Sequence, residues 1–299
     1  MKKIAIIGAN SYIARNVILY LKLHYTEYKL YLYDCGEVQL DGEPNYYQID
    51  ILDSNSVKKI DFSCEYIYMF IGKTGTTAGF EDYNTFIDIN EKALLNVLNE
   101  YIHSNSLAKI IFPSTRLLYK GKEEMLSEDD EKEFKTIYAI NKYSCENYLK
   151  LYNLIYNVQY LTFRICVPYG SLIANASSYG TAGFMLGKAV KGENIILYGD
   201  GNVRRTLTYM EDLCKVLVEG GLSEVLVNDT YNIGGEDYSL KEMAQIIADK
   251  YNISIDFVEY PKIAELIESG STVFNDSKMQ SIYPVEYKGN FKKWCLQLK

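Results

Sequence analysis

The chain has 299 residues, of which 48% are hydrophobic and 23% charged, and its formal net charge is -8. A chain of this size can bury a sizeable core, either in two domains or in one domain with a lobe. The acidic balance argues against sequence-independent binding of nucleic acid, which needs a basic face. The partner is therefore expected to be a small molecule.

The cysteines and histidines narrow the expected class of protein further. The six cysteines include no CxxC pair, the two histidines are isolated, and the N-terminus lacks the apolar run of a secretory signal. These features indicate a cytoplasmic protein with reduced thiols, no metal site and no membrane span.

The first fifty residues contain a strand, a tight turn and a helix. Residues 2–7 are apolar and rich in β-branched side chains, Gly8 follows them, and apolar residues then recur at helical spacing. A second strand over 29–33 ends on Asp34. This layout is typical of a dinucleotide-binding unit, in which a helix N-terminus approaches a pyrophosphate and an acidic residue takes the ribose hydroxyls. No Lys or Arg occurs within four residues after Asp34, which favours NAD over NADP.

The glycine pattern of this turn is incomplete. Only Gly8 survives from a G-x-x-G-x-x-G pattern, because Ser11 and Ala14 occupy the other two positions. Both residues are small enough for a phosphate to approach, although the Cβ of Ser11 restricts its backbone. A first βαβ unit that binds no nucleotide therefore stays open as an alternative.

Strands and helices alternate over the first 165 or so residues. Further strands are predicted over 45–49, 66–71, 109–112 and 159–167, the last broken by Pro168. This alternation predicts an α/β fold with a doubly wound, parallel, Rossmann-like sheet. The second half predicts a smaller α+β C-terminal lobe for substrate, with a loop over 170–183, a helix beyond it and another over 240–251. The predicted NAD-binding domain covers 1–166, with a returning segment near 205–235, and the lobe covers 167–204 and 236–299.

Tyr138 and Lys142 lie four residues apart on a predicted helix, and therefore on one face of it. A fixed cation favours the phenolate, so Lys142 could lower the pKa of Tyr138 and make it a proton acceptor. Thr115 follows a predicted strand at its carboxyl end, the side on which open α/β sheets bind ligands. Because the chain has 29 tyrosines, the Tyr138–Lys142 pair taken alone also fits two ordinary helix residues.

Taken together, these motifs resemble the extended short-chain dehydrogenase/reductases, the branch that contains NAD-dependent epimerases, dehydratases and reductases of nucleotide sugars. The resemblance covers nearly the whole chain in the right order. It rests on the following motifs: Gly8 to Ala14, Asp34, Asp50-Ile51, Asn90, Ser114-Thr115-x-x-x-Tyr119, Tyr138-x-x-x-Lys142 with Glu146, Arg164 leading to Tyr169-Gly170, and Gly199-Asp200-Gly201 followed by Arg205 and Asp212.

The resemblance implies a role for each matching residue. Thr115, Tyr138 and Lys142 would be catalytic, and Thr115, Tyr138 and Arg205 would bind the substrate, with Arg205 on its diphosphate. The implied cofactor-binding residues are Gly8, Ser11, Tyr12, Ile13, Asp34, Asp50, Ile51, Gly72, Lys73, Asn90, Tyr138 and Lys142. The resemblance also implies NAD as cofactor, no metal, a nucleotide-sugar substrate, and a homodimer formed through the helices that contain Asn90 and Tyr138.

Departures from the family pattern narrow the reaction. Arg116-Leu117 stand where the 4,6-dehydratases carry Asp-Glu and where decarboxylases place a glutamate, and Leu117 cannot act as an acid or base. Val167 replaces a substrate-binding Asn, and Lys120 replaces a glycine. The favoured hypothesis is a C4 epimerase. The alternatives are an NAD(P)H-dependent 4-keto-sugar-nucleotide reductase, and a sensor or scaffold that binds NAD without turnover.

Overall fold

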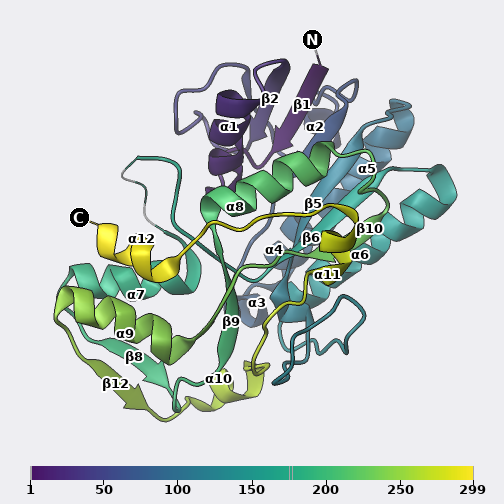
Figure 1. Ribbon diagram of the computed structural model, residues 1–299. Coiled ribbons are helices and arrows are strands. Elements are labelled where there is room, and N and C mark those ends of the chain that lie inside the picture. The colour runs from purple at the N-terminus through teal and green to yellow at the C-terminus, as the bar shows by residue number, and fades with distance from the viewer. Residues whose placement is uncertain (1, 175, 177, 299) are drawn as a thin grey trace.

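The computed structural model describes residues 2–174, 176 and 178–298, and its largest element is a sheet of seven parallel strands in the order β10-β6-β5-β4-β1-β2-β3 (Figure 1). Its strands are β1 (Lys2–Ile7), β2 (Tyr28–Asp34), β3 (Tyr46–Gln48), β4 (Tyr66–Met69), β5 (Lys109–Thr115), β6 (Tyr160–Ile165) and β10 (Asp229–Asn232). The strand order reverses between β1 and β4, which is where doubly wound sheets bind their ligands.

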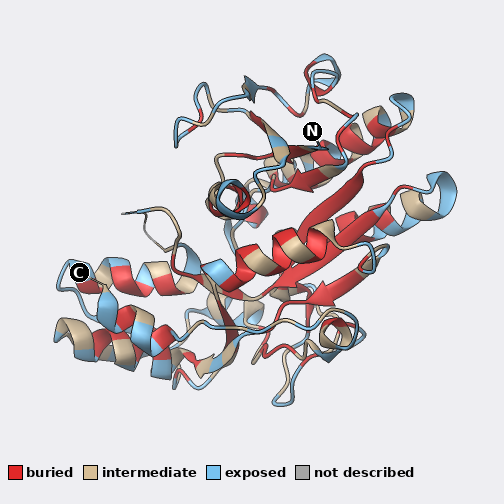
Figure 2. Ribbon diagram, turned by 45° about the horizontal axis from the view of Figure 1, so that its top comes forward, coloured by how far each residue is buried: buried red, intermediate tan, exposed pale blue. Residues whose placement is uncertain are grey.

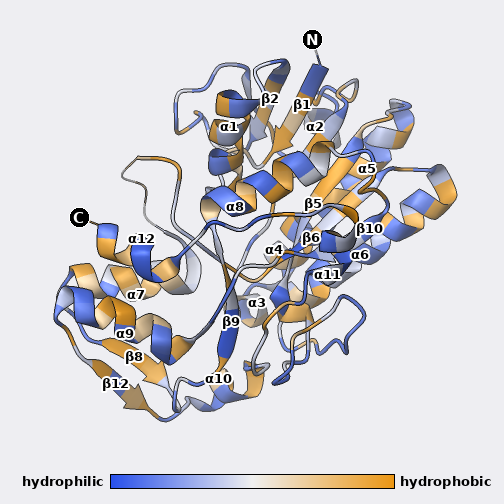
Figure 3. Cartoon of the chain, viewed as in Figure 1, coloured by the Kyte–Doolittle hydropathy of each residue, from blue (hydrophilic) through white to orange (hydrophobic). Residues whose placement is uncertain are grey.

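Helices cover both faces of this sheet because successive side chains of each strand point to opposite faces. Ile4 and Ile6 of β1 pack with α1 (Tyr12–His24) and α8 (Met210–Lys215), whereas Ala5 and Ile7 pack with α2 (Ser54–Val57), α5 (Ala93–His103) and α6 (Ile137–Tyr156). The inner strands β4, β5 and β6 are therefore buried on both sides, as Figure 2 shows, and β5 is largely hydrophobic in Figure 3. Short π-helices, η1 (Asp88–Lys92) and η3 (Val216–Gly220), adjoin α5 and α8.

The helix that carries Tyr138 and Lys142 has well-defined ends. The Thr136 side chain accepts a hydrogen bond of 3.0 Å from the Ala139 amide, which caps the first turn of α6. The helix ends at Asn157, whose φ of 58° is the left-handed conformation that asparagine tolerates. Because the cap fixes the start of the helix, it also fixes the direction of Tyr138 in the first turn.

A smaller lobe, gathered below and to the left of the sheet in Figure 1, contains two small sheets. The first is β7 (Val167–Tyr169), β9 (Arg204–Tyr209) and β11 (Glu236–Ser239) in the order β11-β9-β7, and the second pairs β8 (Ile195–Tyr198) with β12 (Ile255–Val258). Helices α7 (Gly180–Val190), α9 (Leu240–Tyr251) and α12 (Phe291–Gln297) share one hydrophobic cluster with these strands.

The remaining elements are short. They are α3 (Ala78–Glu81), α4 (Tyr83–Ile87), the 3₁₀ turn η2 (Arg116–Leu118), α10 (Lys262–Ile267) and α11 (Ser277–Ile282). Met279 of α11 belongs to the cluster under the large sheet, whereas Phe291 of α12 belongs to the cluster of the lobe. The C-terminal stretch thus packs on both bodies. Within the described ranges, the helices are too short or too polar to cross a bilayer.

The predicted α/β architecture is confirmed, and three of the differences in detail bear on the site and the lobe. Pro168 does not end a strand, because it lies inside β7, an edge strand where a missing N–H is tolerated. Strand β9 was not predicted, since its polar sequence Arg-Arg-Thr-Leu-Thr-Tyr lacks an apolar run. Helix α7 begins at Gly180, inside the predicted loop 170–183, of which residues 175 and 177 lie outside the described part of the chain.

Candidate active site

The turn after β1 requires a glycine. Gly8 has φ of +84°, and a Cβ at this position would lie 2.7 Å from the carbonyl carbon of Phe70. The Gly8 and Ala9 amides both donate to the Tyr33 carbonyl, at 2.8 and 3.1 Å, and so tie the turn to β2. A larger residue would therefore push the turn away from β4.

Helix α1 begins directly behind this turn, with Ser11 as its N-cap. The Ser11 side chain makes no capping hydrogen bond, and its buried Oγ has no partner among the described residues. A buried hydroxyl without a partner is uncommon in folded proteins and needs an explanation. A phosphate oxygen at the helix N-terminus would supply one, so the turn fits the pyrophosphate of a dinucleotide.

Asp34 lies at the end of β2, next to the same turn. Its carboxylate accepts hydrogen bonds from the Asn10 amide at 2.9 Å and the Gly36 amide at 3.2 Å. Farther along this edge, Asp50 is exposed and Ile51 is buried. These three residues lie at the carboxyl ends of β2 and β3, as the prediction of an adenosine site requires.

Thr115, Tyr138 and Lys142 come together in one cavity of about 470 Å³. Thr115 ends β5, while the other two residues lie on the first turns of α6. The described residues that line the cavity are Ser11, Tyr12, Ile13, Phe70, Ile71, Gly72, Thr74, Pro113, Ser114, Thr115, Arg116, Leu117, Tyr138, Lys142, Ile165, Cys166, Val167, Pro168, Tyr179, Gly180 and Thr181. The cavity thus joins the glycine turn, the predicted catalytic residues and the lobe.

Burial dominates the proton equilibria of this site. It raises the pKa of Tyr138 well above the ordinary value, and a hydrogen bond with Thr115 offsets only part of that rise. It also lowers the pKa of Lys142 to about 8. The predicted lowering of the Tyr138 pKa by Lys142 is therefore not found here. The Lys142 Nζ instead donates to the Pro113 carbonyl at 2.9 Å and lies 6.0 Å from the centre of the Tyr138 ring.

Asn90 fixes the backbone beside the cavity. Its side-chain oxygen accepts from the Lys73 amide at 2.9 Å, and its side-chain nitrogen donates to the Lys73 carbonyl at 3.1 Å. Gly72 lies next to this pair, and a Cβ on it would be 3.2 Å from Asn90 Oδ1 and 3.7 Å from Lys142 Nζ. The Lys73 ammonium points elsewhere and pairs with Asp82.

Arg205 lies outside the cavity lining. Its side chain is only 2% exposed, and its guanidinium donates to Glu268 Oε1 at 2.8 Å and to the Gly270 carbonyl at 2.7 Å. Arg205 thus ties β9 to the loop after α10.

Tyr179 and Arg116 are two polar residues of the cavity lining to which the sequence-based prediction assigns no function. Tyr179, the residue before α7, hydrogen bonds through its hydroxyl to that of Thr74 at 2.8 Å, and its ring lies 5.8 Å from the Tyr12 ring. Arg116 lines the wall next to Thr115. A signal for Tyr179 was its position as a large aromatic residue in a loop of small ones. In the sequence, Arg116 differs from the family pattern, and this difference gives no sign of a function.

A buried ion pair supports the segment that follows Thr115. Glu146 and Arg164 are 0% and 3% exposed, and their side chains form two hydrogen bonds of 3.0 and 2.6 Å. Arg164 also donates to the Tyr119 hydroxyl at 2.6 Å, and that hydroxyl donates to Asn232 at 2.7 Å. This network anchors the end of the segment that begins with Thr115.

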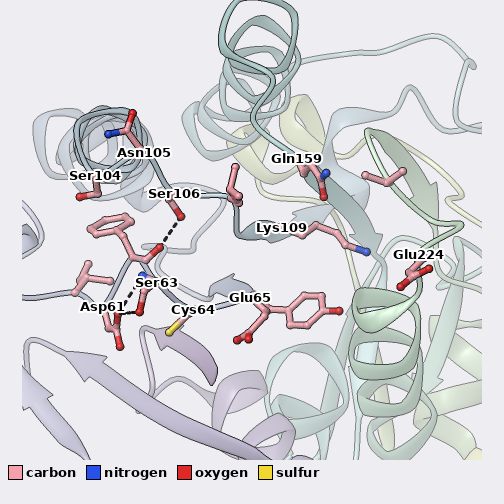
Figure 4. A pocket seen from close by; sticks show the side chains of 15 residues that line it. Asp61, Ser63, Cys64, Glu65, Ser104, Asn105, Ser106, Lys109, Gln159 and Glu224 are labelled. Atoms are coloured by element: carbon pink, nitrogen blue, oxygen red, sulfur yellow. Dashed lines mark hydrogen bonds between the residues drawn. The ribbon is translucent and has the colours of Figure 1, made fainter. Parts of the chain in front are cut away.

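A larger hollow, of about 750 Å³, lies at the opposite edge of the sheet (Figure 4). It is lined at the amino ends of β4 and β5, for example by Glu65 and Lys109. The Lys109 ammonium is already bound by the carbonyls of Ser223 and Leu226. The candidate active site is the smaller cavity, because the carboxyl ends of the strands and the predicted catalytic residues meet there.

Comparison with known proteins decides the family. The model of the NAD dependent epimerase/dehydratase family matches residues 4–234. The chain belongs to this family. Its cofactor is therefore NAD, as predicted, and homologues support its assignment as an enzyme of nucleotide-sugar chemistry.

Family members of different activity resemble this chain to a similar degree. A putative UDP-glucose 4-epimerase of Methanocaldococcus jannaschii is 26% identical over 212 residues, which are 70% of this chain and 68% of the relative. A UDP-N-acetyl-alpha-D-glucosaminuronate decarboxylase of Bacillus cytotoxicus is 26% identical over 230 residues, 75% of this chain and 70% of the relative.

A solved structure shows the same fold over the whole chain. The UDP-glucuronic acid 4-epimerase of Bacillus cereus, crystallised with UDP-glucuronic acid and NAD, superposes with a TM-score of 0.84 at 19% identity. The alignment covers 98% of this chain and 96% of that one.

Proposed function

We propose that the protein is a nucleotide-sugar epimerase that inverts the C4 carbon of its substrate by transient hydride transfer to bound NAD. The observation that carries the proposal is the meeting of Thr115, Tyr138 and Lys142 in a cavity that also reaches Ser11 behind the glycine turn. Epimerases among the relatives support the same reaction class. Leu117, which cannot transfer protons, disfavours dehydration and decarboxylation at this site.

The cofactor would be held along the carboxyl edge of the sheet. Gly8, Ser11, Tyr12 and Ile13 would hold the pyrophosphate at the start of α1, and Asp34 the adenosine ribose. The other predicted contacts, Asp50, Ile51, Gly72, Lys73 and Asn90, lie along this edge or beside the cavity. Asn90 would act through the backbone of Lys73 that it holds.

The protein residues would manage the proton and the orientation of the sugar. Thr115 would hold the C4 oxygen while Tyr138 takes the proton from it, and Tyr138 would return that proton after inversion. Bound NAD supplies the hydride acceptor and a positive charge near the phenol. This positive charge is needed in addition to that of Lys142, because burial alone raises the pKa of Tyr138 and keeps the phenol protonated at neutral pH.

The two bodies of the chain would divide the binding. Residues 1–166, with the returning segment near 205–235, would hold NAD, and 167–204 with 236–299 would hold the nucleotide sugar.

For Arg205 to clamp a diphosphate, it would have to exchange Glu268 for the substrate. We propose this exchange as the way in which Arg205 takes part.

A homodimer through α6 is also proposed. Ile140, Leu151, Leu154 and Ile155 of this helix are 44 to 80% exposed, and their spacing places them along one side of it. Covering this side by a second copy would remove apolar surface from water. Light scattering of the purified chain tests this, and a monomer at micromolar concentration contradicts it.

The six cysteines are unpaired, which supports the cytoplasm as the site of action.

The reaction is tested by NMR of nucleotide sugars incubated with the purified protein and no added reductant. Inversion at C4 without net formation of NADH supports the epimerase. Turnover only when reduced cofactor is supplied would identify a reductase instead. The Tyr138→Phe variant is the control, because it removes the proton-transferring hydroxyl while the NAD content, measured by mass spectrometry, should be retained.

A further inference from the structure

Arg116 differs from every other arginine of the chain in its contacts. The other four each pair with a carboxylate: Arg15 with Asp41 at 2.6 Å, Arg164 with Glu146 at 2.6 Å, Arg204 with Asp237 at 2.9 Å, and Arg205 with Glu268 at 2.8 Å. The Arg116 side chain makes no ion pair or hydrogen bond with any described residue, yet it is half-buried and lines the cavity.

Among the described residues, no carboxylate lines the cavity beside Arg116, and Glu268, whose charge reaches Arg116 from outside this lining, is paired with Arg205. The described residues that line the cavity include the cations Arg116 and Lys142 but no Asp or Glu. This is unusual in a chain of net charge -8. The Lys142 ammonium donates to the Pro113 carbonyl, whereas the guanidinium of Arg116 has no protein acceptor among the described residues.

This arrangement costs free energy in the free protein. Burial, helped by the nearby charge of Arg205, lowers the pKa of Arg116 to about 10, so the group stays charged at neutral pH. A partly buried charge without a counter-ion is unfavourable, and a carboxylate that meets the planar fork with two hydrogen bonds would offset it. The site is therefore built for an anion.

The position of Arg116 in the chain indicates which part of the substrate this anion belongs to. Arg116 directly follows Thr115, in the short turn η2 that the Thr115 side chain itself caps by accepting from the Leu117 amide at 3.3 Å. If Thr115 holds the oxygen on C4, the neighbouring substituents are those on C3 and C5, and of these only the carbon attached to C5 can be a carboxylate. The diphosphate is attached at C1, across the ring from C4.

We propose that Arg116 binds a carboxylate on C5 of the sugar, and hence that the substrate is a nucleotide uronic acid. This inference rests on the proposed function, since it takes Thr115 as the contact of the reacting hydroxyl. Arg116 would act as a specificity residue, and the reaction itself would still be carried by Tyr138.

Calorimetric titration of the NAD-loaded protein with UDP-glucuronate and UDP-glucose tests the proposal, because binding is measured without turnover. Arg116→Gln should weaken UDP-glucuronate binding by about 30-fold or more, since it removes the charged partner of a desolvated carboxylate. It should leave UDP-glucose affinity unchanged. Arg116→Lys should recover part of the uronate affinity, because it restores the charge without the fork. Arg204→Gln is the matched control, since it removes an exposed guanidinium from the lobe.

The outcomes separate this inference from the proposed function. Equal weakening of the binding of UDP-glucuronate, UDP-glucose and UDP alone would place the diphosphate on Arg116. This result would overturn the inference and leave the proposed epimerase function unaffected. Unchanged uronate binding in a folded Arg116→Gln protein, checked by its melting temperature, would also overturn it. If UDP-glucuronate does not bind the unmodified protein, the inference fails, whereas the proposed function is decided separately by the NMR test of inversion at C4.

Discussion

Lys142 is a buried charge, and its replacement by methionine should separate stability from function. Its side chain is 4% exposed, and burial lowers its pKa from 10.5 to about 8. The shift of about 2.5 units corresponds to roughly 3 kcal/mol against the folded state at pH 7. Lys142→Met removes this cost. It also leaves the Pro113 carbonyl without its donor, which costs about 1–3 kcal/mol.

The pH dependence gives a cleaner measurement than stability at a single pH. Between pH 8 and 10.5 the unfolded chain keeps a proton on Lys142 that the folded chain has lost, so the unfolded state binds more protons and stability rises with pH. The unmodified protein should therefore gain roughly 2.5 kcal/mol relative to Lys142→Met between pH 7 and 10. Other titrating groups occur in both proteins and cancel in the difference.

Urea unfolding at the two pH values, with bound NAD removed from both proteins, measures this difference. Lys150→Met is the matched control, because Lys150 lies on the same helix and is exposed. If the difference between the unmodified protein and Lys142→Met stays constant from pH 7 to 10, Lys142 does not have a lowered pKa, and the description of the cavity as desolvated is wrong.

Three further changes test other parts of the site. Gly8→Ala should destabilise the fold by about 1–3 kcal/mol and weaken NAD binding, because φ is +84° and the added Cβ meets the Phe70 backbone; unaltered melting and NAD affinity would contradict this. Asp34→Ala should raise the relative affinity for NADP, measured by titration, since a carboxylate repels the 2′-phosphate; an unchanged NAD/NADP ratio would remove Asp34 from the ribose site. Glu146→Gln should cost about 3–5 kcal/mol in urea unfolding, because it leaves the buried Arg164 charge without its counter-ion, and a loss below about 1 kcal/mol would show that the pair is not needed.

The parallel sheet and the pairing of Tyr138 with Lys142 could be predicted because they depend on local patterns, whereas the grouping of Thr115 with them was implied by the family resemblance. An apolar strand, a glycine turn and an i, i+4 pair can all be read from neighbouring residues. Strand β9 could not be read this way, because Thr206 and Thr208 are buried through long-range pairing with β7 and β11. The same limit applies to the contacts of charged side chains.

Arg205 and Arg116 show this limit most clearly. The sequence pattern places Arg205 in the diphosphate site, but Glu268, 63 residues away, holds its guanidinium in the folded chain. The pattern treats Arg116 as a departure, but in the folded chain it lines the cavity next to Thr115. Arg205 is paired and Arg116 is not because Glu268, at the end of α10, reaches Arg205 only through tertiary packing.

The central claim is that hydride leaves and returns to the same carbon of a nucleotide sugar. Incubation in D₂O, followed by NMR and mass spectrometry of the epimerised product, tests it most directly. The account predicts inversion at C4 with hydrogen, and no deuterium, on that carbon, because the hydride does not exchange with water. Deuterium at the inverted carbon would show that it passes through a solvent-exchanged carbanion, and would contradict hydride transfer at this site.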